Sequence, residues 1–403
     1  MLAVVSVAQF LGMTLWFSAT AITPALIAEY QIAPNHAAWL TMAVQAGFVA
    51  GTLISAVANL ADVLNARVLM FLGSIAGALT NAAVLAAPNG ASVIALRFIT
   101  GASLALVYPP GMKIIAGWFR DGRGLALGVL IGALTLGKAF PHLLTAMFGA
   151  EWRQPMLLVS ALAIAGGTLV LLIVRDGPFV AATAPFDPHA IRKVLSSRGV
   201  RLALVGYLGH MWELYAMWTW VAVFAAASFT ASGMANPAAA GSIAAFLAIG
   251  SGAVGCVLAG YIADRAGKAR VAMWAMLASA ASAAATLIVF GGAPIALYAL
   301  IMFWGFAVVA DSAQFSALVS EHAPRDHVGT ALTLQTCVGF LLTLITIEAL
   351  PRVAEATSWQ WASLLLVPGP LLGAWAMFRL SASAKTLRRD RLEPTIESEN
   401  RLR

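Results

Sequence analysis

Charged residues are scarce in this chain, and cysteine is almost missing. Only 10% of the 403 residues are Asp, Glu, Lys or Arg, whereas soluble domains carry about 25%, and 61% are hydrophobic. This composition excludes a soluble globule and predicts an integral membrane protein. The two cysteines, Cys256 and Cys337, lie inside apolar runs. They therefore support neither a disulfide framework nor a zinc site, and small core residues are the simpler interpretation.

Motifs for nucleotide, metal or acyl chemistry are also missing. The sequence has no P-loop, no zinc-ligand spacing and no G-x-S-x-G elbow. We therefore expect no enzyme activity, no cofactor and no metal. The net charge of +7 would fit nucleic acid or an anionic surface, so the location of the basic residues has to decide between them.

What the chain does contain is twelve apolar runs of about 20 residues, the length that crosses a bilayer. They must be helical, because backbone groups in lipid have to hydrogen bond within their own segment, and no alternating barrel pattern is present. The first run is too long for a signal-peptide core and predicts a retained span; whether a short upstream piece is missing stays open. The predicted spans are 2–28, 37–58, 68–87, 91–116, 124–148, 155–174, 201–228, 238–262, 271–290, 294–319, 328–350 and 360–380.

A Pro-containing basic stretch separates the sixth and seventh spans. We predict an N-terminal six-helix bundle over 1–174, a linker over 175–200, a C-terminal bundle over 201–380 and a flexible tail over 381–403. With the N-terminus inside, the inner loops, the linker, the tail and the inner ends of spans hold 20 of the 24 Lys and Arg, the outer loops hold Arg153 and Arg352, and two remain within spans. The positive-inside rule then predicts cytoplasmic termini in an inner (plasma) membrane, and the net charge needs no nucleic acid because anionic lipid explains it.

The two halves share a charged turn between apolar runs. Residues 260–270 read GYIADRAGKAR, and residues 58–67 read ANLADVLNAR with the Asp and the final Arg in the same register. Arg120-Asp121 followed by Gly124 likewise recurs as Arg325-Asp326 followed by Gly329. The chain is therefore predicted to be an internal duplication.

The turn resembles the G-x-L-A-D-R-x-G-R-K loop of the major facilitator superfamily of secondary transporters. The resemblance covers essentially the whole chain and implies an all-α fold of twelve transmembrane helices in two pseudo-symmetric bundles, usually a monomer. It also implies a gating loop whose aspartate caps a helix terminus and whose basic residues pair across the bundle. The first copy has Val63 and Asn65 where the family has Arg and Gly, so its latch is expected to be the weaker one. The loop residues are Asp62, Arg67, Asp264, Arg265, Lys268 and Arg270.

Ionisable residues inside the spans are functional hypotheses, because each costs several kcal/mol in a bilayer. The resemblance implies that helices 1, 4, 7 and 10 line a cavity, and Arg97, His210, Glu213 and Asp311 fall on three of them. We expect these four to couple protons, with His210 and Glu213 on one helical face and Arg97 and Glu213 as a switchable ion pair. A permanently satisfied pair that only fixes helix packing is the alternative.

Lys138 and His142 share a face of the fifth span at i, i+4 spacing. Lys138 can attract an anionic substrate or pair with Asp311 or Glu213, and the sequence does not choose. Aromatic residues on the predicted cavity helices complete the candidate substrate site, although Trp and Tyr are also common at membrane interfaces and helix contacts. The substrate candidates are Lys138, His142, Tyr108, Tyr207, Trp212 and Tyr215.

These features predict a secondary transporter that moves a small organic solute by alternating access, coupled to protons, as an antiporter working in efflux. Proton-linked uptake of an organic anion is the alternative, with Arg97 and Lys138 as counter-charges. A sensor of the same fold that does not transport is a further one. The ending G-P-x-x-G-G of drug/proton antiporters is not found after Gly137, and the second and eighth spans lack the arginines of nitrate porters.

Overall fold

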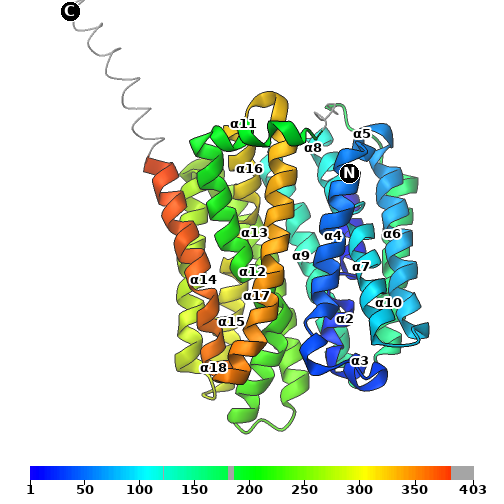
Figure 1. The fold of residues 1–403 in the computed structure, drawn as a ribbon, viewed down its shortest axis with the longest axis vertical. Coiled ribbons are helices and arrows are strands. Elements are labelled where there is room, and N and C mark those ends of the chain that lie inside the picture. The colour runs from blue at the N-terminus through cyan, green and yellow to red at the C-terminus, as the bar shows by residue number, and fades with distance from the viewer. Residues whose placement is uncertain (121, 180–185, 383–403) are drawn as a thin grey trace, which may run out of the picture.

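The computed structural model describes residues 1–120, 122–179 and 186–382, and within them every regular element is a helix. Figure 1 shows the blue-to-cyan helices of the first half grouped beside the green-to-red helices of the second. Eleven helical segments of the described chain are long and apolar enough to cross a membrane. They correspond to the second to twelfth predicted spans.

The first half contains α1 (Leu2–Met13), α2 (Ser18–Ala21), α3 (Thr23–Tyr30), α4 (Trp39–Val57), α5 (Leu60–Val63), α6 (Ala66–Ala83), α7 (Gly90–Leu104), α8 (Tyr108–Trp118), α9 (Arg123–Phe148) and α10 (Arg153–Ile173). The second contains α11 (Ile191–Ser196), α12 (Arg198–Ala231), α13 (Pro237–Ala266), α14 (Lys268–Val289), α15 (Pro294–Ala310), α16 (Ser312–His322), α17 (Val328–Ala356) and α18 (Trp359–Ala362). The last span runs over Trp359–Ala382.

Helix ends follow local chemistry. Asn65, Asn89, Ser197 and Asn236 each accept a backbone N–H of the first turn that follows, at α6, α7, α12 and α13 respectively. The turn between α13 and α14 needs Gly267, whose φ of 91° disfavours other residues. The predicted linker contains α11, and α12 begins at Arg198, slightly before the predicted start of the seventh span.

Three of the four predicted cavity helices are broken near their middle. The first span is interrupted between Met13 and Ser18, the fourth between Leu104 and Tyr108, and the tenth at Asp311, whereas α12 runs through without a break. The first break was not expected, because residues 14–17 contain neither Pro nor Gly. Broken helices are tolerated inside a membrane where neighbouring segments bond the freed backbone groups, and that is where transporters bind substrates.

Small residues set the closest helix contacts, and they do so in matching places in the two halves. A methyl group on Gly47 or Gly101 would collide with the backbone of the facing helix in the α4–α7 pair. The same holds for Gly255 and Gly305 in the α13–α15 pair, which occupies the equivalent position of the second half. Such close approach lets dispersion contacts hold helices together where lipid removes the hydrophobic driving force.

Candidate functional site

Arg97 on α7 binds the backbone carbonyls at the break in the first span. Its guanidinium donates through Nη2 to the carbonyls of Leu15 (2.9 Å) and Trp16 (2.8 Å). Through Nη1 it donates to Asn81 Oδ1 (2.7 Å) and Ser18 Oγ (3.1 Å). The side chain is 0% exposed. Arg97 is therefore a positioning group for the broken helix, and Asn81, which sequence reasoning missed, completes its ligation.

The expected Arg97–Glu213 ion pair is not formed in this structure. Glu213 on α12 instead accepts a hydrogen bond from Trp304 Nε1 of α15 at 2.6 Å. Four donor contacts already fix the Arg97 guanidinium within the first half. Matching depths along two helices place residues at one level of the membrane without bringing them within bonding distance.

His210 has a different partner from the one predicted. Its Nδ1 lies 2.8 Å from Asp311 Oδ1, although the alignment falls short of a hydrogen bond. Both side chains are almost fully buried, and Asp311 occupies the break between α15 and α16. His210 Nε2 has no hydrogen-bond partner. A titratable pair thus joins α12 to a break in a neighbouring helix.

Lys138 on α9 is enclosed by aromatic rings, with 2% of its surface exposed. Its ammonium lies 4.0 Å from the ring centre of Trp16, 4.9 Å from that of Tyr215 and 5.5 Å from that of Trp218. It donates one hydrogen bond, to Tyr215 Oη at 2.6 Å. Lys138 forms no ion pair with any described carboxylate, so neither Asp311 nor Glu213 is its partner here.

Three further polar groups beside Lys138 lack a hydrogen-bond partner. They are Trp16 Nε1, Trp218 Nε1 and both ring nitrogens of His142. Phe17 packs between two of these residues: its ring centre lies 6.2 Å from that of His142 and 6.1 Å from that of Trp218. We call Lys138, His142, Trp16, Tyr215 and Trp218 the Lys138 cage. Its members come from both halves of the chain.

The remaining aromatic candidates lie at different distances from this cage. Tyr108 stacks on Phe48, with ring centres 6.2 Å apart, and Phe48 in turn contacts Trp16. Tyr207 packs near the His210 ring instead, at 6.1 Å. Trp212 donates to the Leu365 carbonyl at 2.8 Å and packs against Gly369 of the last span. Trp212 is therefore a packing residue of the second half and does not belong to the cage.

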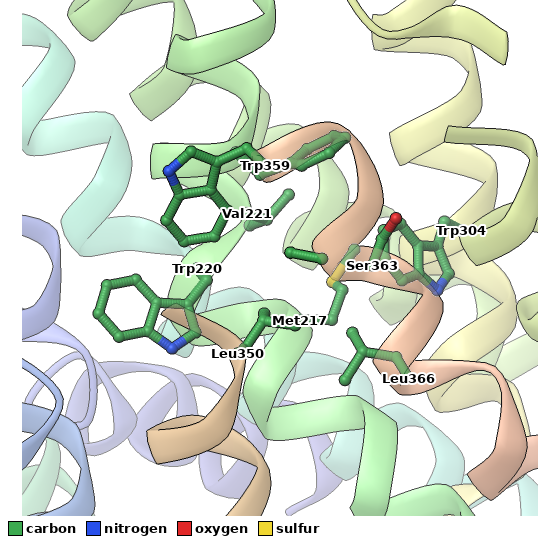
Figure 2. Close-up of a pocket in the computed structure, with 10 residues that line it drawn as sticks. Met217, Trp220, Val221, Trp304, Leu350, Trp359, Ser363 and Leu366 are labelled. Atoms are coloured by element: carbon green, nitrogen blue, oxygen red, sulfur yellow. The ribbon is translucent and has the colours of Figure 1, made fainter. Parts of the chain in front are cut away.

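A small apolar pocket lies within the second half, between α12, α15, α17 and α18 (Figure 2). Trp220, Trp304, Trp359 and Leu350 are among the residues that line it. Trp304, which holds Glu213, thus forms one wall of this pocket. The pocket places Glu213 behind an indole ring and not at an open surface.

The Asp264 carboxylate is the part of the gating loop that reaches the other half. Both of its oxygens lie 3.2 Å from where a methyl group on Gly124 would stand, in the first turn of α9. A carboxylate there is stabilised by the unbonded N–H groups at the helix N-terminus. Further along α9, Gly128 and Gly132 pack on the backbone of α13 at Cys256 and Ala253. The two halves therefore meet closely from Asp264 to the level of Gly132.

The basic loop residues contact groups of their own halves. Arg67 contacts Asp176 at 3.4 Å, and Lys268 contacts Glu321 at 2.7 Å. Arg265 lies over the Tyr261 ring of its own helix at 4.0 Å. Arg270 lies exposed in the first turn of α14. The Asp62 side chain and the tail 383–403 lie outside the described residues.

The arrangement of broken helices, paired glycines and a charged loop in each half agrees with comparisons to known proteins. The model of the Major Facilitator Superfamily matches residues 5–347 and 235–399. This chain belongs to the Major Facilitator Superfamily. Its fold is the all-helical fold of that superfamily, and the protein is a multi-pass membrane protein.

Two transporter relatives are similar over part of the chain. MFS-type transporter pytF of Aspergillus terreus is 26% identical over 180 residues, which cover 44% of this chain and 58% of the relative. Uncharacterized transporter ESBP6 of Saccharomyces cerevisiae is 25% identical over 181 residues, which cover 43% of this chain and 27% of the relative. The matched region thus spans only 58% and 27% of these relatives, and neither printed name states a substrate.

Proposed function

We propose that this protein is a secondary active transporter that moves a small organic solute by alternating access and couples this movement to protons. The observation that carries the proposal is the buried His210–Asp311 pair at 2.8 Å, placed at a break in the tenth span. A proton taken up by the pair changes the charge inside the membrane, where charge is expensive. Such a change favours one arrangement of the broken helix over the other.

The surroundings of the pair support a role in coupling. The charged or titratable groups near it are Glu213 one turn along α12, Tyr207, and the Cys256 thiol, which contacts the Val309 carbonyl just before the break. No Lys or Arg is paired with Asp311 in the described chain, so the imidazole is its only cationic partner. Glu213 is proposed as a second proton site. Arg97 keeps its positioning role and is left out of the proton path.

The proposed site lies in an inner (plasma) membrane with both termini in the cytoplasm. Two cations assigned to outer loops support this orientation: Arg153 pairs with Glu29 and Arg352 with Glu348, so each is neutralised. The basic residues of the linker and gating loops lie at the opposite end (Figure 1). This asymmetry matches the positive-inside rule. Because members of the superfamily are usually monomers, we propose that this protein is a monomer.

The test is proton movement in proteoliposomes that contain the purified protein and an internal pH-sensitive dye. Benzoate, hexanoate, benzylamine and a neutral sugar are added outside in turn, and the sign of the pH change gives the direction, including the expected efflux mode. Asp311→Asn and His210→Gln should remove the proton movement while exchange of labelled substrate continues. Glu355→Gln, which changes an exposed carboxylate near the end of α17, is the control. Unchanged proton movement in both pair variants would refute the coupling role.

A non-transporting sensor gives a different result in the same preparation. It would bind a solute without any flux of that solute across the vesicle membrane. Flux of a labelled solute with no proton movement would instead show uniport or another coupling ion. Either result would overturn the proposed function.

A further inference from the structure

The Lys138 cage contains hydrogen-bond donors in excess of acceptors. Lys138 carries three N–H groups and uses one of them, toward Tyr215. The indole N–H groups of Trp16 and Trp218 have no acceptor, and an indole can only donate. Most buried polar groups in proteins are hydrogen-bonded, so several unused donors around one cation are unusual. What the cluster lacks is an anion.

The charge of the Lys138 cage also indicates an anionic ligand. Aromatic rings around a cation stabilise it, but here the ring faces are already taken by the Lys138 ammonium. An organic cation would be repelled by that ammonium at close range. No described carboxylate pairs with Lys138, so its charge has no counterpart within the structure. A carboxylate ligand would both neutralise the charge and accept from the free donors.

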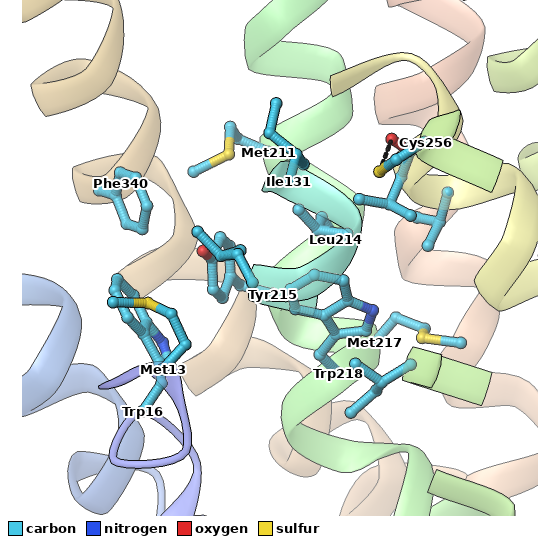
Figure 3. Packing of buried hydrophobic residues seen from close by; sticks show 14 of the residues in the cluster. Met13, Trp16, Ile131, Met211, Leu214, Tyr215, Met217, Trp218, Cys256 and Phe340 are labelled. Carbon is cyan, nitrogen blue, oxygen red and sulfur yellow. Dashed lines mark hydrogen bonds between the residues drawn. The ribbon is translucent and has the colours of Figure 1, made fainter. Parts of the chain in front are cut away.

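The walls beside the cage are apolar and aromatic. Phe340 of α17 lies 4.7 Å from Phe48 and 5.7 Å from Trp16 between ring centres, and 5.1 Å from Tyr215. Figure 3 shows Phe340, Trp16 and Tyr215 on three different segments around one region. An apolar body of the ligand fits such walls better than a sugar, which would leave hydroxyl groups unpaired.

The cage is divided between the two halves. Lys138, His142 and Trp16 belong to the first half, whereas Tyr215 and Trp218 belong to α12 of the second. Lys138 is 2% exposed in this structure, so a ligand reaches it when the halves separate. A site built this way is exposed and covered by the same movement that alternating access requires.

We propose that the Lys138 cage is the binding site for a small organic anion with one carboxylate and an apolar, preferably aromatic, body. Lys138 and the indole N–H groups hold the carboxylate, and Phe48 and Phe340 hold the body. His142 supplies a further N–H. This inference names the substrate class of the transporter proposed above and rests on that function.

The test is calorimetric binding to the purified full-length protein in lipid nanodiscs, without any proton gradient. The probes are benzoate, phenylacetate and hexanoate, each matched with its neutral amide, and benzylamine as the cation. The carboxylates should bind saturably, and the amides and benzylamine should not. Lys138→Gln should weaken carboxylate binding by about tenfold to a hundredfold, the worth of a charge-assisted hydrogen bond.

Three variants separate the contributions of charge, donors and fold. Lys138→Arg should keep most of the affinity, because it keeps the positive charge. Trp218→Phe should lose about threefold to tenfold, because it removes one N–H and keeps a ring. Arg192→Gln, which removes an exposed cation of α11, should bind like the unchanged protein. Trp218→Phe also tests the site if Lys138→Gln fails to fold.

Two results would overturn the proposal: benzylamine or the amides binding as tightly as the carboxylates, or none of the three carboxylates binding. Equal affinity of Lys138→Gln and the unchanged protein would do the same. Failure of the transport proposal is distinguishable, because carboxylate binding without flux or proton movement would leave the cage as an anion site. Proton-coupled flux of a cation, by contrast, would retain the transport function and refute the anion.

Discussion

Lys138 should lower the free energy of unfolding of the protein. Variants of Lys138 and of Arg97 can be compared to test this. Burial of an ammonium costs several kcal/mol. Cation–π contacts return about 2 kcal/mol, and the hydrogen bond to Tyr215 about 1.5–3 kcal/mol. Lys138→Met alone would leave the Tyr215 hydroxyl unpaired. The double variant Lys138→Met/Tyr215→Phe removes both partners and keeps their approximate shape, so it should stabilise the protein by about 1–4 kcal/mol.

Arg97 should behave in the opposite way, although it is an equally buried cation of the same half. Arg97→Met would remove the donor to the Trp16 carbonyl and leave one Ser18 hydroxyl to serve both the Leu15 carbonyl and the Asn81 amide oxygen. Removing one partner from such a buried network costs about 3–5 kcal/mol. The contrast arises because Arg97 has acceptors for its charge in the structure and Lys138 has a single phenol oxygen.

The measurement is the thermal unfolding midpoint of each purified variant in one detergent, followed by helical circular dichroism. In a chain longer than 250 residues, 1 kcal/mol corresponds to roughly 2 °C or less. We expect a rise of about 2–8 °C for Lys138→Met/Tyr215→Phe and a fall of about 6–10 °C for Arg97→Met. A fall of similar size in both would refute the reasoning, because it would mean that Lys138 is held as firmly as Arg97.

Three further predictions concern the helix contacts. Glu213→Gln keeps an oxygen that accepts the facing indole N–H, so its unfolding midpoint should stay within about 2 °C; a larger fall would show that the negative charge itself joins α12 to α15. Asp264→Asn removes a carboxylate that contributes about 0.3–1 kcal/mol beside the N-terminus of α9. Maleimide labelling of buried Cys256, followed by mass spectrometry, should therefore become about twofold to fivefold faster. An unchanged labelling rate would argue that the loop does not hold the halves together. Gly101→Leu should prevent assembly of α4 on α7 and abolish the monodisperse peak in size-exclusion chromatography, whereas the same change at the exposed Ala95 should not; equal behaviour of the two would refute the close contact.

The helical type of the elements and eleven of the spans could be predicted from the sequence. Eleven of the twelve predicted spans are long apolar helices, because a run of about 20 apolar residues has no other stable form in lipid. The repeated charged turn identified the superfamily through its local pattern, and the family comparison confirmed it. These properties depend on each segment by itself, which is why a single sequence carries them.

The break in the first span could not be predicted in this way. Residues 14–17 are Thr, Leu, Trp and Phe, none of which interrupts a helix. The break exists because Arg97 and Asn81, on two other helices, bind the carbonyl and hydroxyl groups that it frees. Its cause lies outside the segment that shows it.

The ionisable residues show the same division. The sequence by itself determined that Arg97, Lys138, His210, Glu213 and Asp311 lie within the membrane, because hydropathy depends on the residues of one segment. Only the tertiary structure decided that His210 meets Asp311, that Glu213 meets Trp304 and that Lys138 meets aromatic rings. Partner choice depends on the distances and rotations between helices, which are set by where glycines let backbones approach and side chains fill the space between them.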